Sequence, residues 1–250
     1  MTDLLAVTLG NTSVAAAAAG ADGALRDVRC EPLDGLESLV GPRLEAAEGP
    51  VIVCSVNPPA LARLRRAAKA VGSDPPLVAG EDFPIPIRTD VDEPARVGTD
   101  RLLAALAAHR RAGGACIVVD AGTAVTVDAV DDAGVFLGGA IFPGPGLMAR
   151  SLADGAAQLP HVEVGREFVP DEVIGRNTED AIRSGITRAV AAAVARLASE
   201  MRDALEMAVP VYVTGGYALP QSEAGGADWT VVPDLVLEGL ILAWREHHKP

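Results

Sequence analysis

The sequence predicts two α/β domains of one fold, duplicated in a single chain and separated by a cleft. An apolar run leading into a glycine turn occurs twice, at residues 4–12 and 116–124, with a constant shift of 112 residues. In each copy the turn is followed by a strand, a second turn with glycine, and a third strand. We therefore expect one domain at residues 1–112 and the other at residues 113–250.

Short apolar runs and helical spacing predict the elements of each half in order. In the first half, we expect strands at residues 4–7, 13–19, 24–30 and 51–55, helices at 59–71 and 101–111, and a long loop at 75–94. In the second half, we expect a turn at 120–123, strands at 115–119, 124–130, 135–141 and 211–214, and helices at 179–205 and about 234–245. This alternation of strands and helices is typical of α/β domains.

The composition excludes several classes of function. The 250 residues are 49% hydrophobic and carry a formal net charge of −13, with a pI of about 4.7. Because such a chain repels phosphate at long range, we expect no nucleic-acid partner. Cys30, Cys54 and Cys116 have no zinc-ligand spacing and are expected to be reduced, buried thiols. With no signal peptide or membrane-length apolar run recognisable, we expect a cytoplasmic protein with no membrane partner.

The two glycine turns suggest phosphate binding. A glycine between two strands lets the backbone approach a ligand closely, and the N–H groups and Thr hydroxyl that follow can hold a phosphate. A carboxylate at the end of a strand, as at Asp120, can hold a cation that offsets phosphate charge. Two such turns would grip the phosphates of ATP from both sides.

Seven motifs, in this order and at these separations, make the sequence resemble type III pantothenate kinases. This family lies within the ribonuclease H-like superfamily of actin, sugar kinases and chaperone ATPases. The motifs are residues 10–12, 98–101, 120–128, 138–144, 177–178, 214–216 and 235–240. The resemblance covers nearly the whole chain and implies two duplicated ribonuclease H-like domains of the actin and sugar-kinase type.

The resemblance also implies an activity. Members transfer the γ-phosphate of ATP to pantothenate, giving 4′-phosphopantothenate in the first step of coenzyme A synthesis. They are homodimers that use Mg²⁺ and a monovalent cation, K⁺ or NH₄⁺. Carried over to this sequence, the catalytic base is Asp100 and the cation ligand is Asp120. The implied pantothenate-binding residues are Gly98, Thr99, Asp100, Arg101 and Thr178, and the implied ATP-binding residues are Thr8, Leu9, Gly10, Asn11, Thr12, Ser13 and Thr123.

The sequence departs from the family at Thr8, where the first loop normally begins with Asp. A neutral hydroxyl is a poorer ligand for a hard cation than a carboxylate. The second copy of the repeat keeps a carboxylate at this place, Asp120. Two alternatives to an active pantothenate kinase therefore stay open. One is a weakened or inactive relative that acts as a ligand-binding or transcriptional accessory regulator, and the other is a kinase for another small hydroxyl compound.

Each candidate site residue also has a purely structural interpretation. Asp100 or Thr99 is a candidate cap for the helix at 101–111, and Thr178 for the helix at 179–205. Asp120 is a candidate turn residue, and Arg101 a candidate for a solvated helix position. Sequence alone leaves these alternatives open.

Overall fold

The chain forms two compact units in the computed structural model, which describes residues 4–20, 22–164, 172–217 and 229–248. One unit comprises Met1–Arg111 together with Asp234–Pro250, and the other is Ala112–Pro233. This division differs from the expected halves at the C-terminal end, because the last helix packs on the first sheet. In the described part of the chain, no helix is both long and apolar enough to span a membrane.

The first unit is built on a mixed sheet with the strand order β3-β2-β1-β4-β5. Strand β1 pairs antiparallel with β2 and parallel with β4, so the sheet combines a meander with parallel strands. The strands of this sheet are β1 (Leu4–Leu9), β2 (Ser13–Ala19), β3 (Leu25–Pro32), β4 (Val51–Ser55) and β5 (Leu77–Val78). The short strand β6 (Arg88–Thr89) does not belong to this sheet. Strand β4 confirms the buried strand predicted at residues 51–55.

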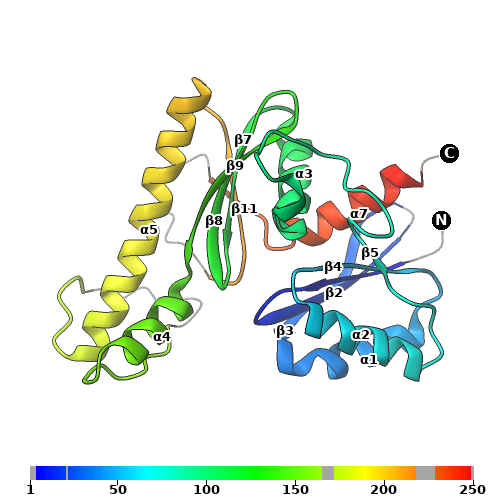
Figure 1. Cartoon of the computed structure of the whole chain (residues 1–250), viewed down its shortest axis with the longest axis horizontal. Helices are drawn as coiled ribbons and strands as arrows, with labels where there is room; N and C mark the ends of the chain where they lie inside the picture. Colours follow the sequence, from blue (N-terminus) through cyan, green and yellow to red (C-terminus); the bar gives the residue numbers. More distant parts are fainter. Residues whose placement is uncertain (1–3, 21, 165–171, 218–228, 249–250) are drawn as a thin grey trace. The chain divides into compact units, whose positions relative to one another are not determined.

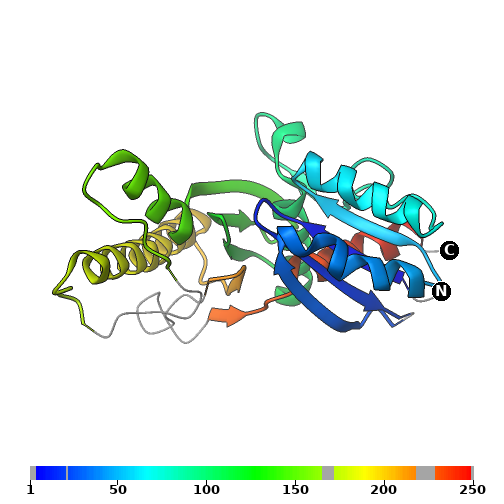
Figure 2. The ribbon, with the colours of Figure 1, turned by 90° about the horizontal axis from the view of Figure 1, so that it is seen from below.

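Four α-helices of the first unit cover the two faces of its sheet (Figures 1 and 2). Helices α1 (Leu36–Ala46) and α2 (Pro58–Ala70) pack on the face that carries Leu5, Val7 and Leu9. Helices α3 (Thr99–Ala112) and α7 (Leu235–His247) pack on the opposite face. Short 3-10 helices lie at Leu33–Gly35 and Pro94–Arg96.

Helices α3 and α7 approach each other at Gly239. A Cβ atom placed on this glycine would lie 2.6 Å from the carbonyl carbon of Leu103 and closer still to its oxygen. Because an added Cβ would overlap the backbone of α3, residue 239 of α7 must be a glycine. Beside this contact, the Arg111 guanidinium donates two hydrogen bonds to the Glu238 carboxylate, at 2.6 and 2.7 Å.

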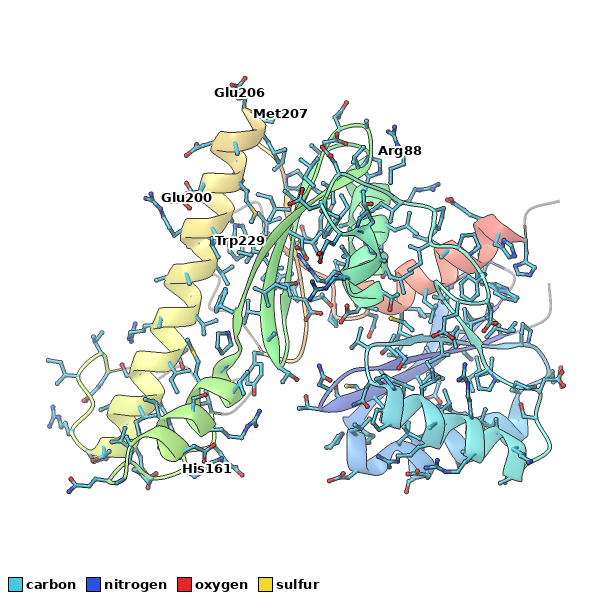
Figure 3. The ribbon with its side chains drawn as sticks, viewed as in Figure 1. Arg88, His161, Glu200, Glu206, Met207 and Trp229 are labelled. Atoms are coloured by element: carbon cyan, nitrogen blue, oxygen red, sulfur yellow. The ribbon has the colours of Figure 1, made fainter. Side chains whose placement is uncertain are left out.

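The second unit has its own mixed sheet, whose strands run in the order β11-β10-β7-β8-β9. These strands are β7 (Cys116–Ala121), β8 (Ala124–Val130), β9 (Val135–Pro143), β10 (Val211–Thr214) and β11 (Trp229–Val231). The long helix α5 (Thr178–Leu205) packs its apolar stripe on one face of this sheet, with Trp229 in the same cluster (Figure 3). Helix α4 (Pro145–Gly155) packs against the first half of α5 through Ala149, Ile182 and Ile186.

Backbone bonds extend the internal repeat beyond the glycine turns. Strands β1 and β7 are related by the predicted shift of 112 residues and have the same burial pattern along their length. Leu5 N–H donates to the carbonyl of Pro50, and Ile117 N–H donates to that of Pro210. Each proline directly precedes the parallel strand that joins the sheet next, β4 or β10. The duplicated α/β architecture predicted from the sequence is therefore confirmed.

Several local predictions need correction. The segment at residues 75–94 is not a plain loop, because it contains the short strands β5 and β6. Asp120 and Ala121 complete strand β7, so the turn consists of Gly122 and Thr123. Cys30 is exposed on β3, whereas Cys54 and Cys116 are buried as expected. Helices α1 and α4 lie outside the expected elements, because each contains a Gly–Pro or Pro–Gly pair that is typical of a turn.

Candidate functional site

Asp100 lies in the first turn of α3, beside the end of strand β4. Its Oδ1 accepts a 2.8 Å hydrogen bond from the N–H of Arg101. A Cβ atom on Gly98 would lie 2.5 Å from this Oδ1 and 3.9 Å from Cγ1 of Val56, which follows β4. Burial raises the pKa of the Asp100 carboxyl above its usual value, although the Arg101 N–H and guanidinium oppose this shift. A carboxylate with a raised pKa is a better proton acceptor.

Thr8 lies on the same face of the sheet as the start of α3. It is the register partner of Cys54 in the parallel pair β1–β4, and such partners point to the same side. Cys54 belongs to the cluster beneath α3 and α7, and its Sγ lies 3.5 Å from Oγ1 of Thr99. Burial, and secondarily the Asp100 carboxylate, raise the pKa of the Cys54 thiol to about 12. Thr8, Thr99 and Asp100 therefore belong to the same end and face of one sheet.

The first glycine turn (residues 10–12) connects β1 to β2 at this end. The Gly10 N–H donates to the carbonyl of Ser13 at 2.9 Å, which closes the turn. Asn11 and Thr12 are exposed. This arrangement places the predicted ATP-binding segment and Asp100 in the same unit, both at the carboxyl ends of β1 and β4.

The second glycine turn (residues 122–123) connects β7 to β8 and is tightly packed. A Cβ atom on Gly144 would lie 2.7 Å from the carbonyl oxygen of Thr123 and closer still to that of Gly122. Gly215 has φ +101°, and its Cβ would lie 2.6 Å from the backbone of Ala121. The Asp120 carboxylate faces the turn, with Oδ1 3.3 Å from the Cβ position of Gly122. The backbones of the second glycine turn, Gly144 and Gly215 thus lie in close contact at the end of β7.

Substituting Gly144 by Ala is expected to displace the second glycine turn, because the added methyl group would meet carbonyl oxygens rather than a movable side chain. Overpacking of this kind costs about 1–3 kcal/mol of folding stability. If the turn binds ATP, as the family resemblance implies, we expect its displacement to lower ATP affinity about tenfold or more. Isothermal titration calorimetry measures this. The matched control is Gly155→Ala at the other end of α4, where a Cβ would meet nothing within 4 Å. Equal ATP affinity in both variants would contradict the expectation.

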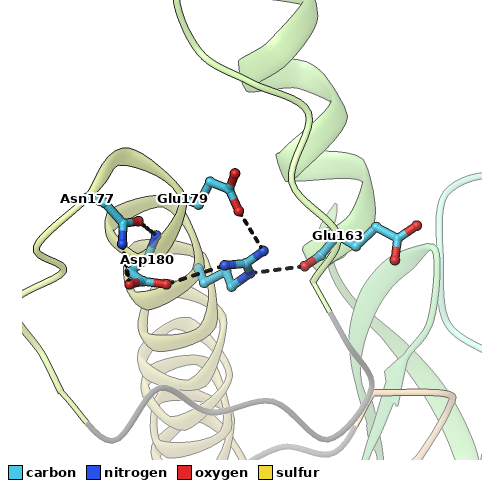
Figure 4. A network of polar contacts seen from close by, with 5 residues as sticks. Glu163, Asn177, Glu179 and Asp180 are labelled. Carbon is cyan, nitrogen blue, oxygen red and sulfur yellow. Dashed lines mark hydrogen bonds and ion pairs between the residues drawn. The ribbon is translucent and has the colours of Figure 1, made fainter.

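Thr178 is the first residue of α5 and does not cap it, which corrects the structural alternative. The cap is Asn177, whose Oδ1 accepts a 2.9 Å hydrogen bond from the N–H of Asp180. Figure 4 shows the polar network beside it, in which an arginine of α5, Arg183, bonds Glu179, Asp180 and the carbonyl of Glu163. Thr178 itself is exposed, so its hydroxyl is accessible from solvent.

The structure also shows the surroundings of Thr99, Asp100, Arg101 and Asp120. Helix α3 begins at Thr99, two residues before the expected start, so Thr99 and Asp100 are helical residues. Arg101 is half-buried. Within the described residues, no group of three or more His, Cys, Asp or Glu side chains is placed to hold a metal ion. A cation at Asp120, which the family resemblance implies, would therefore need further ligands such as backbone oxygens or the nucleotide.

Sequence reasoning missed the residues that hold the first glycine turn from behind. Asn57 Nδ2 donates to the carbonyl of Gly10 at 3.2 Å, and Ser55 Oγ bonds the backbone of Asn57. The signal was an Asn directly before two prolines, which is typical of a helix N-cap. Tyr217 was also missed, and its N–H donates to the carbonyl of Ala121 behind the second turn.

Comparison with known proteins identifies the family. The family model described as type III pantothenate kinase matches residues 4–200. The chain is 37% identical over 195 residues to a type III pantothenate kinase of Dehalococcoides mccartyi, covering 78% of this chain and 74% of that protein. It is 40% identical over 200 residues to one of Gluconobacter oxydans, covering 80% and 73%. The chain belongs to the type III pantothenate kinase family.

Solved structures give this family member its wider fold class. A putative Baf family transcriptional activator from Campylobacter jejuni superposes with a TM-score of 0.58 at 20% identity, covering 97% of this chain and 98% of that one. A ROK family glucokinase from Streptomyces griseus, in complex with glucose and AMPPNP, gives 0.54 at 13% identity, covering 97% and 99%. These likenesses show the ribonuclease H-like fold of actin and sugar kinases.

Proposed function

We propose that this chain transfers the γ-phosphate of ATP to the primary hydroxyl of pantothenate, with Asp100 as the general base. The observation that carries this role is the position of Asp100, a half-buried carboxylate at the same sheet end as the first glycine turn. Family membership supports the reaction and its two substrates.

In the proposed reaction, the hydroxyl oxygen attacks the γ-phosphorus as the bond to the β-phosphate oxygen breaks. The hydroxyl proton passes to Asp100, and ADP leaves with the bridging oxygen. A primary hydroxyl is a poor nucleophile, so a carboxylate within hydrogen-bond reach assists as the new bond forms. Phosphoryl transfer otherwise depends on positioning and on offsetting the charge of the phosphate oxygens.

The remaining site residues are assigned within this proposal. Residues 8–13 and Thr123 bind ATP, while residues 98–101 and Thr178 bind pantothenate. Arg101 suits the carboxylate of pantothenate, because a guanidinium binds such groups through two parallel hydrogen bonds. Asp120 binds K⁺ or NH₄⁺, and Mg²⁺ enters as the complex with ATP. A homodimer in the cytoplasm completes the proposal, and its mass in solution can be measured by light scattering.

The direct test is ATP-dependent phosphorylation of pantothenate with K⁺ and Mg²⁺ present, followed by mass spectrometry of the product. A panel of other small hydroxyl compounds, run in parallel, tests the alternative substrate. Turnover no higher than that of the Asp100→Asn variant would rule the proposal out, and a better substrate in the panel would replace pantothenate.

Substituting Thr8 by Asp separates a kinase from a regulator. Thr8 occupies the position in β1 that Asp120 occupies in β7, so the change restores a carboxylate at the first turn. If the chain is a kinase limited by cation binding, we expect kcat/KM to rise about tenfold and the Mg²⁺ requirement to fall. Steady-state kinetics over a Mg²⁺ titration measures both. ATP or pantothenate binding by calorimetry, without turnover in either protein, would favour the regulator instead.

A further inference from the structure

Asn57 joins the end of β4, the start of α2 and the first glycine turn. Its Oδ1 accepts a 3.0 Å hydrogen bond from the N–H of Ala60, which caps α2. Its Nδ2 donates to the carbonyl of Gly10 at 3.2 Å. The amide orientation is fixed by these partners, because the oxygen faces a donor and the nitrogen faces an acceptor. One side chain therefore serves two elements that are far apart in the sequence.

The bond to Gly10 controls the direction of a neighbouring N–H. The peptide group between Gly10 and Asn11 is planar and trans, so its C=O and N–H point in opposite directions. Because the C=O of Gly10 points toward Asn57, the N–H of Asn11 points away from Asn57. An N–H fixed in this way needs no reorganisation when a phosphate oxygen arrives.

The second unit provides an internal comparison. Val56 N–H donates to the carbonyl of Leu9 at 3.2 Å, and Tyr217 N–H donates to that of Ala121, the residue 112 positions later, at 3.0 Å. The next carbonyl is supported differently in the two copies. That of Gly10 accepts from the Asn57 side chain, whereas that of Gly122 lies against the backbone of Gly144. In the second turn the main-chain bond is from the Gly144 N–H to the carbonyl of Thr123, at 2.9 Å. A side chain therefore bonds the first turn, and main chain bonds the second.

We propose that Asn57 is a positioning residue for ATP, whose side-chain amide orients the first glycine turn toward the phosphates. The inference rests on the proposed kinase function, since it assigns the turn to ATP. Capping alone does not explain an asparagine here. Ser and Asp cap helices equally well, but neither carries a second group that can donate to Gly10 while the first accepts from Ala60.

The test uses Asn57→Ser and Asn57→Asp, which keep the capping oxygen and remove the donor. We expect melting temperatures close to wild type and a KM for ATP raised about fivefold, as for loss of one neutral hydrogen bond. The KM for pantothenate should stay unchanged. Asn57→Ala, which also removes the cap, should in addition lower the melting temperature.

A second readout needs no ligand and no turnover. Amide hydrogen exchange at Gly10 and Val56, whose N–H groups bond across the turn, should accelerate about fivefold in Asn57→Ser. Faster exchange with no effect on catalysis would contradict the ATP role of Asn57. An inactive wild-type protein would contradict the proposed function, and hydrogen exchange would then still test whether Asn57 orients the turn. Unchanged exchange and unchanged KM for ATP would overturn the inference, as would an equal loss in every kinetic parameter.

Discussion

Substituting Asp100 by Asn is expected to lower kcat by about 10²- to 10⁴-fold, the range for loss of a general base. The amide keeps the size of the side chain and can still accept a hydrogen bond from the Arg101 N–H, so the start of α3 should be preserved. Because no assigned ATP contact is removed, ATP affinity should stay near the wild-type value. Steady-state kinetics and calorimetry measure the two quantities separately.

The matched control for this experiment is Asp234→Asn. Asp234 also has a carboxyl pKa raised by burial, and it stands directly before α7 with no proposed role in the reaction. Its replacement should leave kcat unchanged. If both variants lost the same activity, the effect of Asp100 would be one of stability and not of catalysis.

The raised pKa of Asp100 also predicts two pH effects. The base must be deprotonated, so kcat/KM should fall as the pH falls through this raised pKa. The pH dependence of folding stability has the opposite sign. A carboxyl whose pKa is higher in the folded state favours folding below its unfolded pKa, and this contribution is lost as the pH rises through the folded value. At neutral pH the Asp100→Asn variant should therefore melt at the same temperature as wild type or higher, despite its lower kcat.

Substituting Gly239 by Ala should have the largest effect on stability. The new methyl group would overlap the Leu103 carbonyl, which belongs to the backbone of α3 and cannot turn aside as a side chain can. We expect the free energy of unfolding to fall by about 3 kcal/mol, at the upper end for overpacking. That is a large part of the stability of a typical domain. Since α3 carries Asp100, activity should fall as well.

The control for Gly239 is Gly185→Ala within α5. A Cβ at this position would meet nothing within 4 Å. Alanine forms helices better than glycine, so this variant should gain about 0.5–1 kcal/mol. Urea unfolding followed by circular dichroism compares the two. A similar change in both variants would show that the α3–α7 approach does not limit the size of residue 239.

The sequence was sufficient where the physical signal is local or repeated. The shift of 112 residues predicted both central strands and both glycine turns, because the same nearly continuous burial along the strand occurs in both copies. Helix α5 was predicted to within one residue from the spacing of its apolar stripe. Asp100 could be proposed as the base only through its family motif, since the surrounding residues are equally typical of a helix start.

Other features depend on contacts that no local pattern encodes. The apolar face of α7 would suit either sheet, so the sequence could not say which unit it completes. Helix α1 was missed because its internal Gly–Pro pair is typical of a helix end, and α4 because its opening Pro–Gly pair is equally typical of a turn. The bridge from Asn57 to Gly10 joins residues 47 positions apart, and only the parallel pairing of β1 and β4 brings them together.

The placement of α7 has a consequence for how the protein is made. The second unit is continuous in sequence, whereas the first needs residues from both ends of the chain. During translation, the face that carries Leu4, Ala6 and Ile52 would have α3 but lack α7 until Leu237 and Leu240 leave the ribosome. The half that carries Asp100 is thus synthesised first and completed last, and over that interval it is the half most exposed to chaperones and proteases.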